Sequence, residues 1–175
     1  MHILFVCTGN ICRSPTAERL AAAHAAQYAI PDLTASSAGT RAVIGHPVHR
    51  DAAVVLEGLG GDTSGFAARQ LTAKIASSAH LIIAMTGTHR DIVLETAPRQ
   101  LQRTFTLTEA SRLASMDEAE TLADLAGLRP RLGTKDKPDI PDPIGQSPEV
   151  FAAIGAQIAD LLPPIMELCR RTIRA

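Results

Sequence analysis

The chain has 175 residues, of which 46% are hydrophobic but only 3% aromatic, and its 17 basic and 18 acidic side chains give a net charge of −1. This length predicts one domain, residues 1–175, with an aliphatic core. The charge balance argues against nucleic-acid binding, which usually needs a basic excess or run. No apolar stretch of membrane-spanning length, no signal peptide and only three cysteines are found, so we expect a cytoplasmic protein without a disulfide framework.

Short apolar runs alternate with helix-like segments along the chain. Strands are expected at 2–6, 33–38, 80–85 and 103–107, and helices at 15–29, 50–59, 72–78, 88–96, 108–114 and 148–171. This alternation is typical of parallel βαβ units, which predicts an α/β fold with an open sheet and helices on both faces. A short helix and a loop are expected across 115–141, and the pair Pro163-Pro164 should kink the last helix or divide it.

Residues 7–15 read CTGNICRSP and directly follow the first expected strand. Ligands of open parallel sheets bind beyond the carboxyl ends of strands, where loops lead into helices. A helix start is predicted here, with Ser14 as the N-cap and Pro15 at the first helical position. Gly9 and Asn10 best tolerate the left-handed backbone that lets N–H groups converge on an anion. We therefore expect inorganic phosphate or a similar oxyanion to bind in this loop.

Two side chains of the loop give it chemistry. The thiol of Cys7, among converging N–H groups, should have a lowered pKa and act as a thiolate nucleophile, with Ser14 bonded to the sulfur. Arg13 can hold two phosphoryl oxygens with its guanidinium. A buried structural cysteine is the ordinary alternative, but the residue types in this order favour a phosphate-transfer site. The expected phosphate-binding loop comprises Thr8, Gly9, Asn10, Ile11, Cys12, Arg13 and Ser14.

The loop sequence resembles the signature of low-molecular-weight protein tyrosine phosphatases. Similar stretches are SAGT at 37–40, ARQLT at 68–72, LIIAMT at 81–86 and DPIG at 142–145. The resemblance implies a flavodoxin-like, four-stranded parallel sheet in which Ser37 supports the loop. It also implies hydrolysis of phosphate monoesters on proteins without a metal or cofactor. The partners would be a phosphorylated protein and, by analogy, a cognate kinase.

Asp142 is the expected general acid. An alkyl or aryl oxygen leaves poorly as an anion, so a positioned acid should protonate it and later accept a proton from the water that attacks the phosphocysteine. An Asp-Pro turn is an equal alternative from the residues alone, and the family resemblance favours the acid. Asp139, which no proline follows, is the weaker candidate.

The other cysteines and the histidines are given different expectations. Cys12 could form a reversible disulfide with Cys7 when peroxide oxidises the nucleophile, and the resembling family assigns its cysteine this protective role. Packing under the loop is the alternative, and both can hold. Cys169 is expected to lie inert in the core. Structural or exposed positions are expected for His24, His80 and His89.

The substrate mouth departs from the family pattern. Val43 stands near an aromatic wall position, and Ile144 follows the Asp-Pro pair where many members have aromatic residues, so the slot should be aliphatic. Phe66 stands nearest to a histidine that supports the loop asparagine in some members. The mouth is expected along 41–49, where acidic flanks of a phosphopeptide could meet Arg41, His46 and His49; a solvated loop is the alternative.

The loop position of Ile11 bears on the substrate. Protein arginine phosphatases resemble this chain in lacking paired aromatics, but they carry Thr there, so Ile11 favours phosphotyrosine and leaves phosphoarginine as the alternative. An arsenate reductase would need further resolving cysteines, and only Cys169 lies outside the loop. A non-catalytic phosphate-binding module would need neither Cys7 nor Asp142.

Overall fold

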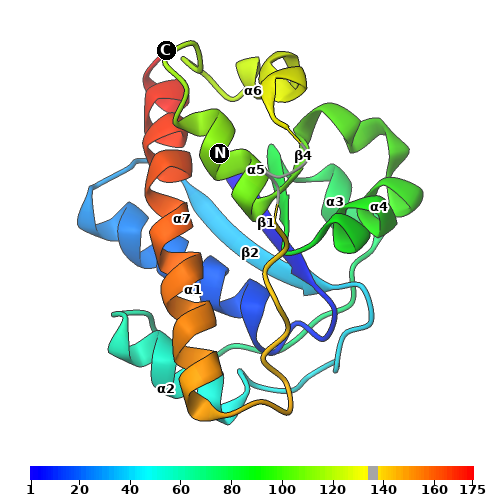
Figure 1. The fold of residues 1–175 in the computed structure, drawn as a ribbon, viewed down its shortest axis with the longest axis vertical. Helices are drawn as coiled ribbons and strands as arrows, with labels where there is room; N and C mark the ends of the chain where they lie inside the picture. Colours follow the sequence, from blue (N-terminus) through cyan, green and yellow to red (C-terminus); the bar gives the residue numbers. More distant parts are fainter. Residues whose placement is uncertain (134–137) are drawn as a thin grey trace.

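The computed structural model describes residues 1–133 and 138–175, and the part of the expected loop across 134–137 lies outside the described residues. Figure 1 shows strands surrounded by helices. Within the described residues the strands are β1 (His2–Cys7), β2 (Thr34–Gly39), β3 (Leu81–Ala84) and β4 (Thr104–Thr106). The α-helices are α1 (Arg13–Gln27), α2 (Arg50–Gly58), α3 (Ala73–Ser77), α4 (Gly87–Thr96), α5 (Leu107–Ala114), α6 (Asp124–Leu128) and α7 (Pro148–Arg174), and 3₁₀ turns lie at Pro98–Arg103 and Arg129–Arg131.

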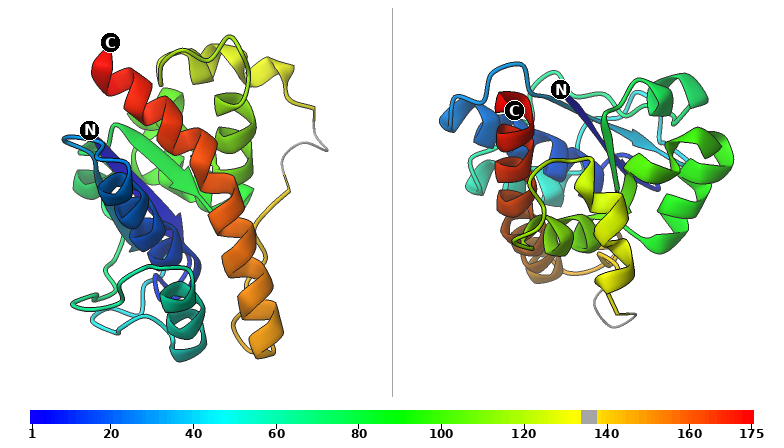
Figure 2. Two further views of the ribbon diagram at one scale, coloured as in Figure 1. Left: turned by 90° about the vertical axis from the view of Figure 1, so that its left-hand side faces the viewer. Right: turned by 90° about the horizontal axis from the view of Figure 1, so that it is seen from above.

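The strands described here form one parallel sheet in the order β2-β1-β3-β4. Because side chains alternate along β1, Ile3 and Phe5 pack with α1, α5 and α7, whereas Leu4 and Val6 pack on the opposite face with residues of α3 and α4. The two views in Figure 2 show α1 and α7 running side by side over one face. The expected α/β fold, with helices on both faces, is confirmed.

Helix α7 differs from its expectation, because it continues through Pro163 and Pro164 as one helix. Each proline removes a backbone hydrogen bond and crowds the preceding turn. Leu162 and Ile165, on either side of the pair, are both buried in the same core cluster. Packing against α1 and α5 therefore keeps both halves helical, and the expected division was wrong.

Helix α7 also corrects the sequence-based statement about membrane-spanning segments. By length and composition alone its 27 residues would suffice to cross a membrane. Core helices of globular domains meet the same two criteria, and most of the buried side chains of α7, from Ile154 to Cys169, belong to the main core cluster. The length and composition of α7 are therefore explained by its packing in the core of the fold.

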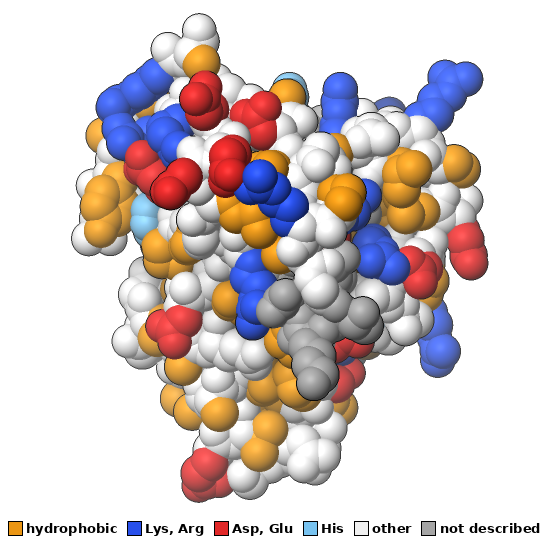
Figure 3. Space-filling view, turned by 45° about the horizontal axis from the view of Figure 1, so that its top comes forward, with side chains coloured by type: hydrophobic (Ala, Val, Ile, Leu, Met, Phe, Trp, Pro, Cys, Tyr) orange, Lys and Arg blue, Asp and Glu red, His pale blue; other side chains and the backbone are white. Residues whose placement is uncertain are grey.

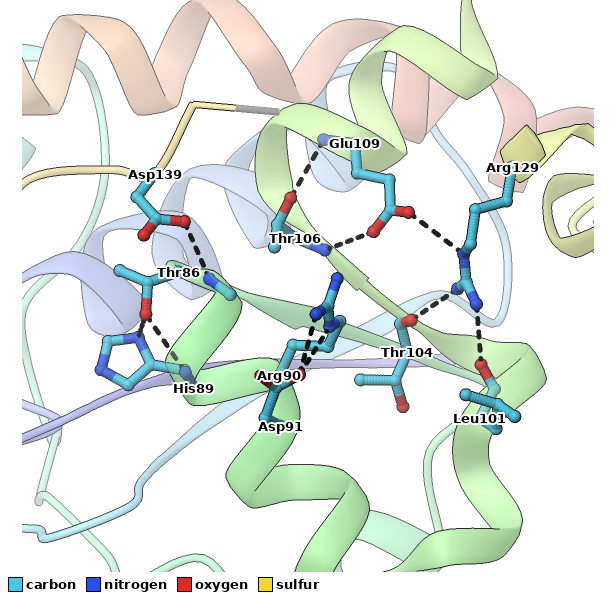
Figure 4. Close-up of polar contacts among 11 residues, drawn as sticks. Thr86, His89, Arg90, Asp91, Leu101, Thr104, Thr106, Glu109, Arg129 and Asp139 are labelled. Carbon is cyan, nitrogen blue, oxygen red and sulfur yellow. Dashed lines mark hydrogen bonds and ion pairs between the residues drawn. The ribbon is translucent and has the colours of Figure 1, made fainter. Parts of the chain in front are cut away.

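A buried ion pair fastens the segment after α5 to the sheet. The carboxylate of Glu109, fully buried, lies 3.1 Å from Arg129 Nε and also completes a capping box with Thr106 at the start of α5. Arg129 Nη2 donates to the Thr104 carbonyl at 2.8 Å (Figure 4). These bonds give the charged pair several partners, which a buried charge requires.

Candidate active site

The loop after β1 leads into α1 as expected, but with different capping. The helix begins at Arg13, with Cys12 at the N-cap, so the prediction that Ser14 caps the helix was wrong. The hydroxyl of Ser14 instead lies 3.0 Å from the Cys7 sulfur and accepts a hydrogen bond from Asn10 Nδ2 at 3.0 Å. Pro15 is the third helical residue, where a missing N–H costs nothing because first-turn N–H groups have no partner within the helix.

One loop residue adopts the left-handed backbone. Asn10 has φ +56°, as its residue type allows, but Gly9 lies outside that region, contrary to expectation. A Cβ on Gly9 would meet side-chain carbons of Ile11 and Val43 at 3.4 and 3.6 Å, which are ordinary contacts. Of Gly9 and Asn10, only Asn10 therefore adopts the left-handed conformation in this loop.

Asn10 is the buried hub that holds the loop. Its Nδ2 donates to Ser37 Oγ at 2.7 Å as well as to Ser14, and its Oδ1 accepts the backbone N–H of Arg69 at 2.9 Å. Ser37 Oγ in turn donates to Glu18 Oε2 at 2.5 Å. Burial raises the pKa of the Glu18 carboxyl, although the hydrogen bond from Ser37 opposes that shift. A chain of hydrogen bonds thus runs from Ser14, which contacts the Cys7 sulfur, through Asn10 and Ser37 to Glu18. The Glu18 carboxyl was not identified from the sequence.

Phe66 stands apart from this network. Its ring lies 5.6 Å from the Arg19 guanidinium carbon. Ser37 and the backbone of Arg69 therefore hold Asn10 where some family members use a histidine.

The segment after β2 wraps around the loop. Its backbone N–H groups donate to loop carbonyls at 2.7–2.9 Å in the pairs Thr40–Cys7, Arg41–Thr8, Val43–Gly9 and His49–Ile11. Gly39 passes so close that a Cβ there would lie 2.5 Å from the Thr8 carbonyl oxygen. Only glycine allows this approach, which fixes the loop backbone from one side.

A pocket of about 260 Å³ brings the predicted chemistry together. Its lining includes Cys7, Arg13 and Asp142, together with the expected mouth residues Arg41, Val43 and Ile144. Val43 and Ile144 are 39% and 45% exposed, so the mouth has two accessible aliphatic walls.

The two expected mouth histidines lie outside that lining. His49 caps α2, where its Nδ1 accepts the Asp51 N–H at 3.3 Å, and its ring stacks on Phe151 at 5.1 Å between centroids. His46 does not line the pocket either. The expectation that His49 belongs to the mouth was therefore wrong, because its ring is used in packing α2 against α7.

Arg13 and Asp142 contact each other. Arg13 Nη2 donates to Asp142 Oδ2 at 2.7 Å, and Nη1 donates to the Ile140 carbonyl at 3.0 Å. The Asp142 side chain remains 49% exposed, whereas Arg13 is only 5% exposed. Asp139, the weaker candidate, accepts the Gly87 N–H at 2.8 Å and so joins this loop to the start of α4 (Figure 4).

The other two cysteines are both buried. Cys12 packs with Val48, Ala52 and Phe151, and burial, with a further contribution from Cys7, raises the pKa of its thiol to about 12. Cys169 lies in the main core, where burial raises its pKa to about 12. At neutral pH both are therefore protonated thiols.

His89 contacts the loop, which its sequence context did not indicate. It is buried near the start of α4, and its Nε2 lies 2.8 Å from Thr8 Oγ1. In the sequence, Thr86 stands three positions before His89, which is typical of an N-cap at a helix start. This local pattern does not indicate a contact between His89 and the distant loop.

The chain is similar in sequence to a family of known proteins. Residues 2–124 match the family model described as low molecular weight phosphotyrosine protein phosphatase. Etp of Escherichia coli K12, a low molecular weight protein-tyrosine-phosphatase, is 40% identical over 103 residues, 59% of this chain and 66% of Etp. Wzb of the same organism, of the same description, is 32% identical over 154 residues, 87% of this chain and 84% of Wzb.

A solved structure shares the fold over nearly the whole chain. A mutant of YwlE arginine phosphatase with a phosphorylated active site serine superimposes with a TM-score of 0.77 and 26% identity, covering 95% of this chain and 94% of that one. The match of the family model over most of the chain, together with the similarity to Wzb, shows that this chain belongs to the low molecular weight phosphotyrosine protein phosphatase family.

Proposed function

We propose that the protein hydrolyses phosphotyrosine on proteins through a phosphocysteine intermediate. The observation that carries this proposal is the meeting of Cys7, Arg13 and Asp142 in one pocket at the carboxyl end of β1. A thiolate nucleophile, a guanidinium for phosphoryl oxygens and a carboxylic acid are the three groups that this chemistry needs.

In the first step the phosphoryl group lies in the loop, where backbone N–H groups and the Arg13 guanidinium bind its oxygens. The Cys7 sulfur attacks phosphorus and the bond to the tyrosyl oxygen breaks. Asp142 gives its proton to that oxygen, so tyrosine leaves as a neutral phenol. The exposed Asp142 side chain can turn from Arg13 towards the leaving group.

In the second step water attacks the phosphocysteine. Asp142, now a carboxylate, takes the proton from the water, and the phosphorus–sulfur bond breaks to release phosphate and the thiolate. The Ser14 hydroxyl, 3.0 Å from the sulfur, donates a hydrogen bond that stabilises the departing thiolate. The phosphorylated active site serine of the YwlE mutant supports a covalent step at this loop.

The substrate proposal depends on the mouth and on Ile11. Val43 and Ile144 offer aliphatic contacts to a ring, and Ile11 provides bulk without a hydroxyl for a guanidinium. The curated relatives Etp and Wzb are named as tyrosine phosphatases. Protein arginine phosphatase activity is the second candidate, favoured by the fold similarity to YwlE arginine phosphatase.

The partners follow from the same reaction. We expect phosphorylated proteins as substrates, a protein kinase that supplies them, and a cytoplasmic location. Basic and acidic side chains are interspersed on the described part of the face in Figure 3, which supports a protein partner over nucleic acid. Cys7 and Cys12 both line the active-site pocket, which supports a protective disulfide between them under peroxide.

The remaining alternatives have less support. Cys169, the one cysteine outside the loop, is buried in the core, which disfavours the thiol relay of an arsenate reductase. A non-catalytic phosphate-binding module would not need the carboxylic acid of Asp142 beside the phosphate-binding guanidinium of Arg13.

Hydrolysis of p-nitrophenyl phosphate tests the proposal. We expect turnover that vanadate inhibits, that EDTA leaves intact and that Cys7→Ser abolishes. Near-normal turnover by Cys7→Ser would refute the mechanism. Rates on phosphotyrosine and phosphoarginine peptides then decide between the two substrates.

A further inference from the structure

His89 links the first residue of the phosphate-binding loop to α4. Its Nε2 lies 2.8 Å from Thr8 Oγ1, and its Nδ1 lies 2.9 Å from Thr86 Oγ1. Thr86 also accepts the His89 backbone N–H at 3.1 Å as the N-cap of α4 (Figure 4). One buried ring therefore joins the loop residue next to Cys7 to the start of a helix.

The charge state of the ring limits how these bonds can be arranged. Burial, followed by the charge of Arg13, lowers the pKa of His89 to about 4, although Asp142 and Asp139 oppose this shift. At neutral pH the imidazole therefore has one N–H and one lone pair. It donates to one threonine hydroxyl and accepts from the other, so both ring nitrogens are satisfied and the ring orientation is fixed.

Thr8 is held from two directions. Its carbonyl oxygen accepts the Arg41 N–H at 2.9 Å on the side of β2, and its hydroxyl contacts His89 on the side of α4. Thr8 lines the active-site pocket next to the nucleophile. Losing the imidazole would leave the residue beside Cys7 with only the backbone anchor.

We propose that His89 is a positioning residue for the phosphatase reaction, acting through Thr8 to hold Cys7 and the loop N–H groups in line with the phosphoryl group. The proposal rests on the proposed function for its effect on turnover, and it adds a residue that does not touch the substrate. Small displacements at a reacting centre have large effects on rate, which makes the anchor measurable.

Two amide substitutions separate positioning of the loop from capping of the helix. A Gln side chain places its amide near the site of Nε2, whereas the shorter Asn amide lies near Nδ1. We expect His89→Gln to retain kcat within about threefold, because it still reaches Thr8. We expect His89→Asn to keep the Thr86 contact but to lower kcat about tenfold or more.

A double substitution tests whether the effect passes through Thr8. Thr8→Val should lower kcat about as much as His89→Asn, and the variant carrying both changes should lose no more than either alone. Binding of inorganic phosphate, measured by its shift of the unfolding midpoint, should weaken in His89→Asn and not in His89→Gln.

Three results would overturn the proposal: equal activity of the Gln and Asn variants, a loss confined to Gln, or additive effects of Thr8→Val and His89→Asn. Wild type and Cys7→Ser are assayed alongside. An inactive wild type would refute the phosphatase function itself, and the phosphate-dependent shift would still decide whether His89 positions the loop.

Discussion

Arg13 Nη2 donates a hydrogen bond of 2.7 Å to Asp142 Oδ2, so the proposed phosphate clamp and the proposed general acid contact each other directly. A phosphate bound in the loop needs the same guanidinium. Arg13 is buried and fixed by the Ile140 carbonyl, whereas Asp142 is half-exposed, so Asp142 is the partner that can move. Substrate binding is therefore expected to displace the carboxylate and bring it towards the leaving oxygen.

Neutralising the carboxylate should tighten phosphate binding. In Asp142→Asn the competing anion is gone and a negative charge beside the phosphate is removed, so we expect inorganic phosphate to inhibit at roughly three- to tenfold lower concentration. Asp139→Asn is the matched control, since it makes the same charge change at a residue bonded to Gly87 and not to Arg13. Equal effects of both substitutions, or weaker binding by Asp142→Asn, would contradict the displacement.

Removal of the acid should matter most when the leaving group is poor. For Asp142→Ala we expect kcat to fall roughly a hundredfold or more on alkyl-substituted phenyl phosphates, and less on nitrophenyl phosphate, whose phenolate leaves without a proton. The measurement is the slope of log kcat against leaving-group pKa, which should become steeper. An unchanged slope would show that Asp142 does not protonate the leaving oxygen.

Glu18 gives a prediction for stability against pH. Burial raises the pKa of its carboxyl in the folded chain, so the folded state holds this proton more tightly than the unfolded state. The stability that this group contributes is complete at low pH and is lost as the pH rises through the folded pKa. Glu18→Gln, neutral throughout and still able to accept from Ser37, should gain stability relative to wild type as the pH rises above 4.5.

Urea unfolding of both proteins across pH 4 to 8 measures this difference directly. Glu57→Gln on α2 is a suitable control, because it makes the same chemical change at an exposed residue. Parallel stability curves for wild type and Glu18→Gln would contradict the role of burial at this position.

Ile11 should control the choice of substrate. A Thr hydroxyl at this position can bond a guanidinium that Ile cannot, so Ile11→Thr should shift the ratio of kcat/KM towards phosphoarginine by about tenfold. Phosphotyrosine and phosphoarginine peptides of one sequence provide the measurement. A wild type that already prefers phosphoarginine would show that the protein is an arginine phosphatase. If Ile11→Thr leaves the ratio of kcat/KM values unchanged, Ile11 does not control substrate specificity.

The sequence was sufficient where a local pattern and the fold agree. The apolar run before Cys7 and the Ala-rich segment after Pro15 predicted β1 and α1, and the order of residue types between them predicted a loop around the nucleophile. Asn10 adopts its left-handed conformation because its residue type and the turn require the same backbone.

The sequence was insufficient where distant contacts decide. Ser14 has the residue type of an N-cap, but its hydroxyl is instead hydrogen-bonded to the Cys7 sulfur and to Asn10. The prolines of α7 are tolerated only because a packed core holds the helix on both sides. His89 reaches Thr8 across 81 positions, a pairing that the parallel order of β1 and β3 creates and no local pattern contains.

The most direct test of the mechanism is to trap the covalent intermediate. The Asp142→Ala variant is mixed rapidly with a phosphotyrosine peptide, and the reaction is quenched and the protein digested. The mass of the fragment of this chain that contains residues 7–13 is then measured by mass spectrometry. The mechanism predicts one added phosphoryl group on Cys7, formed at the rate at which tyrosine is released and absent from Cys7→Ala. Release of tyrosine without any phosphoryl group on that sulfur, or a group located on another side chain, would contradict it.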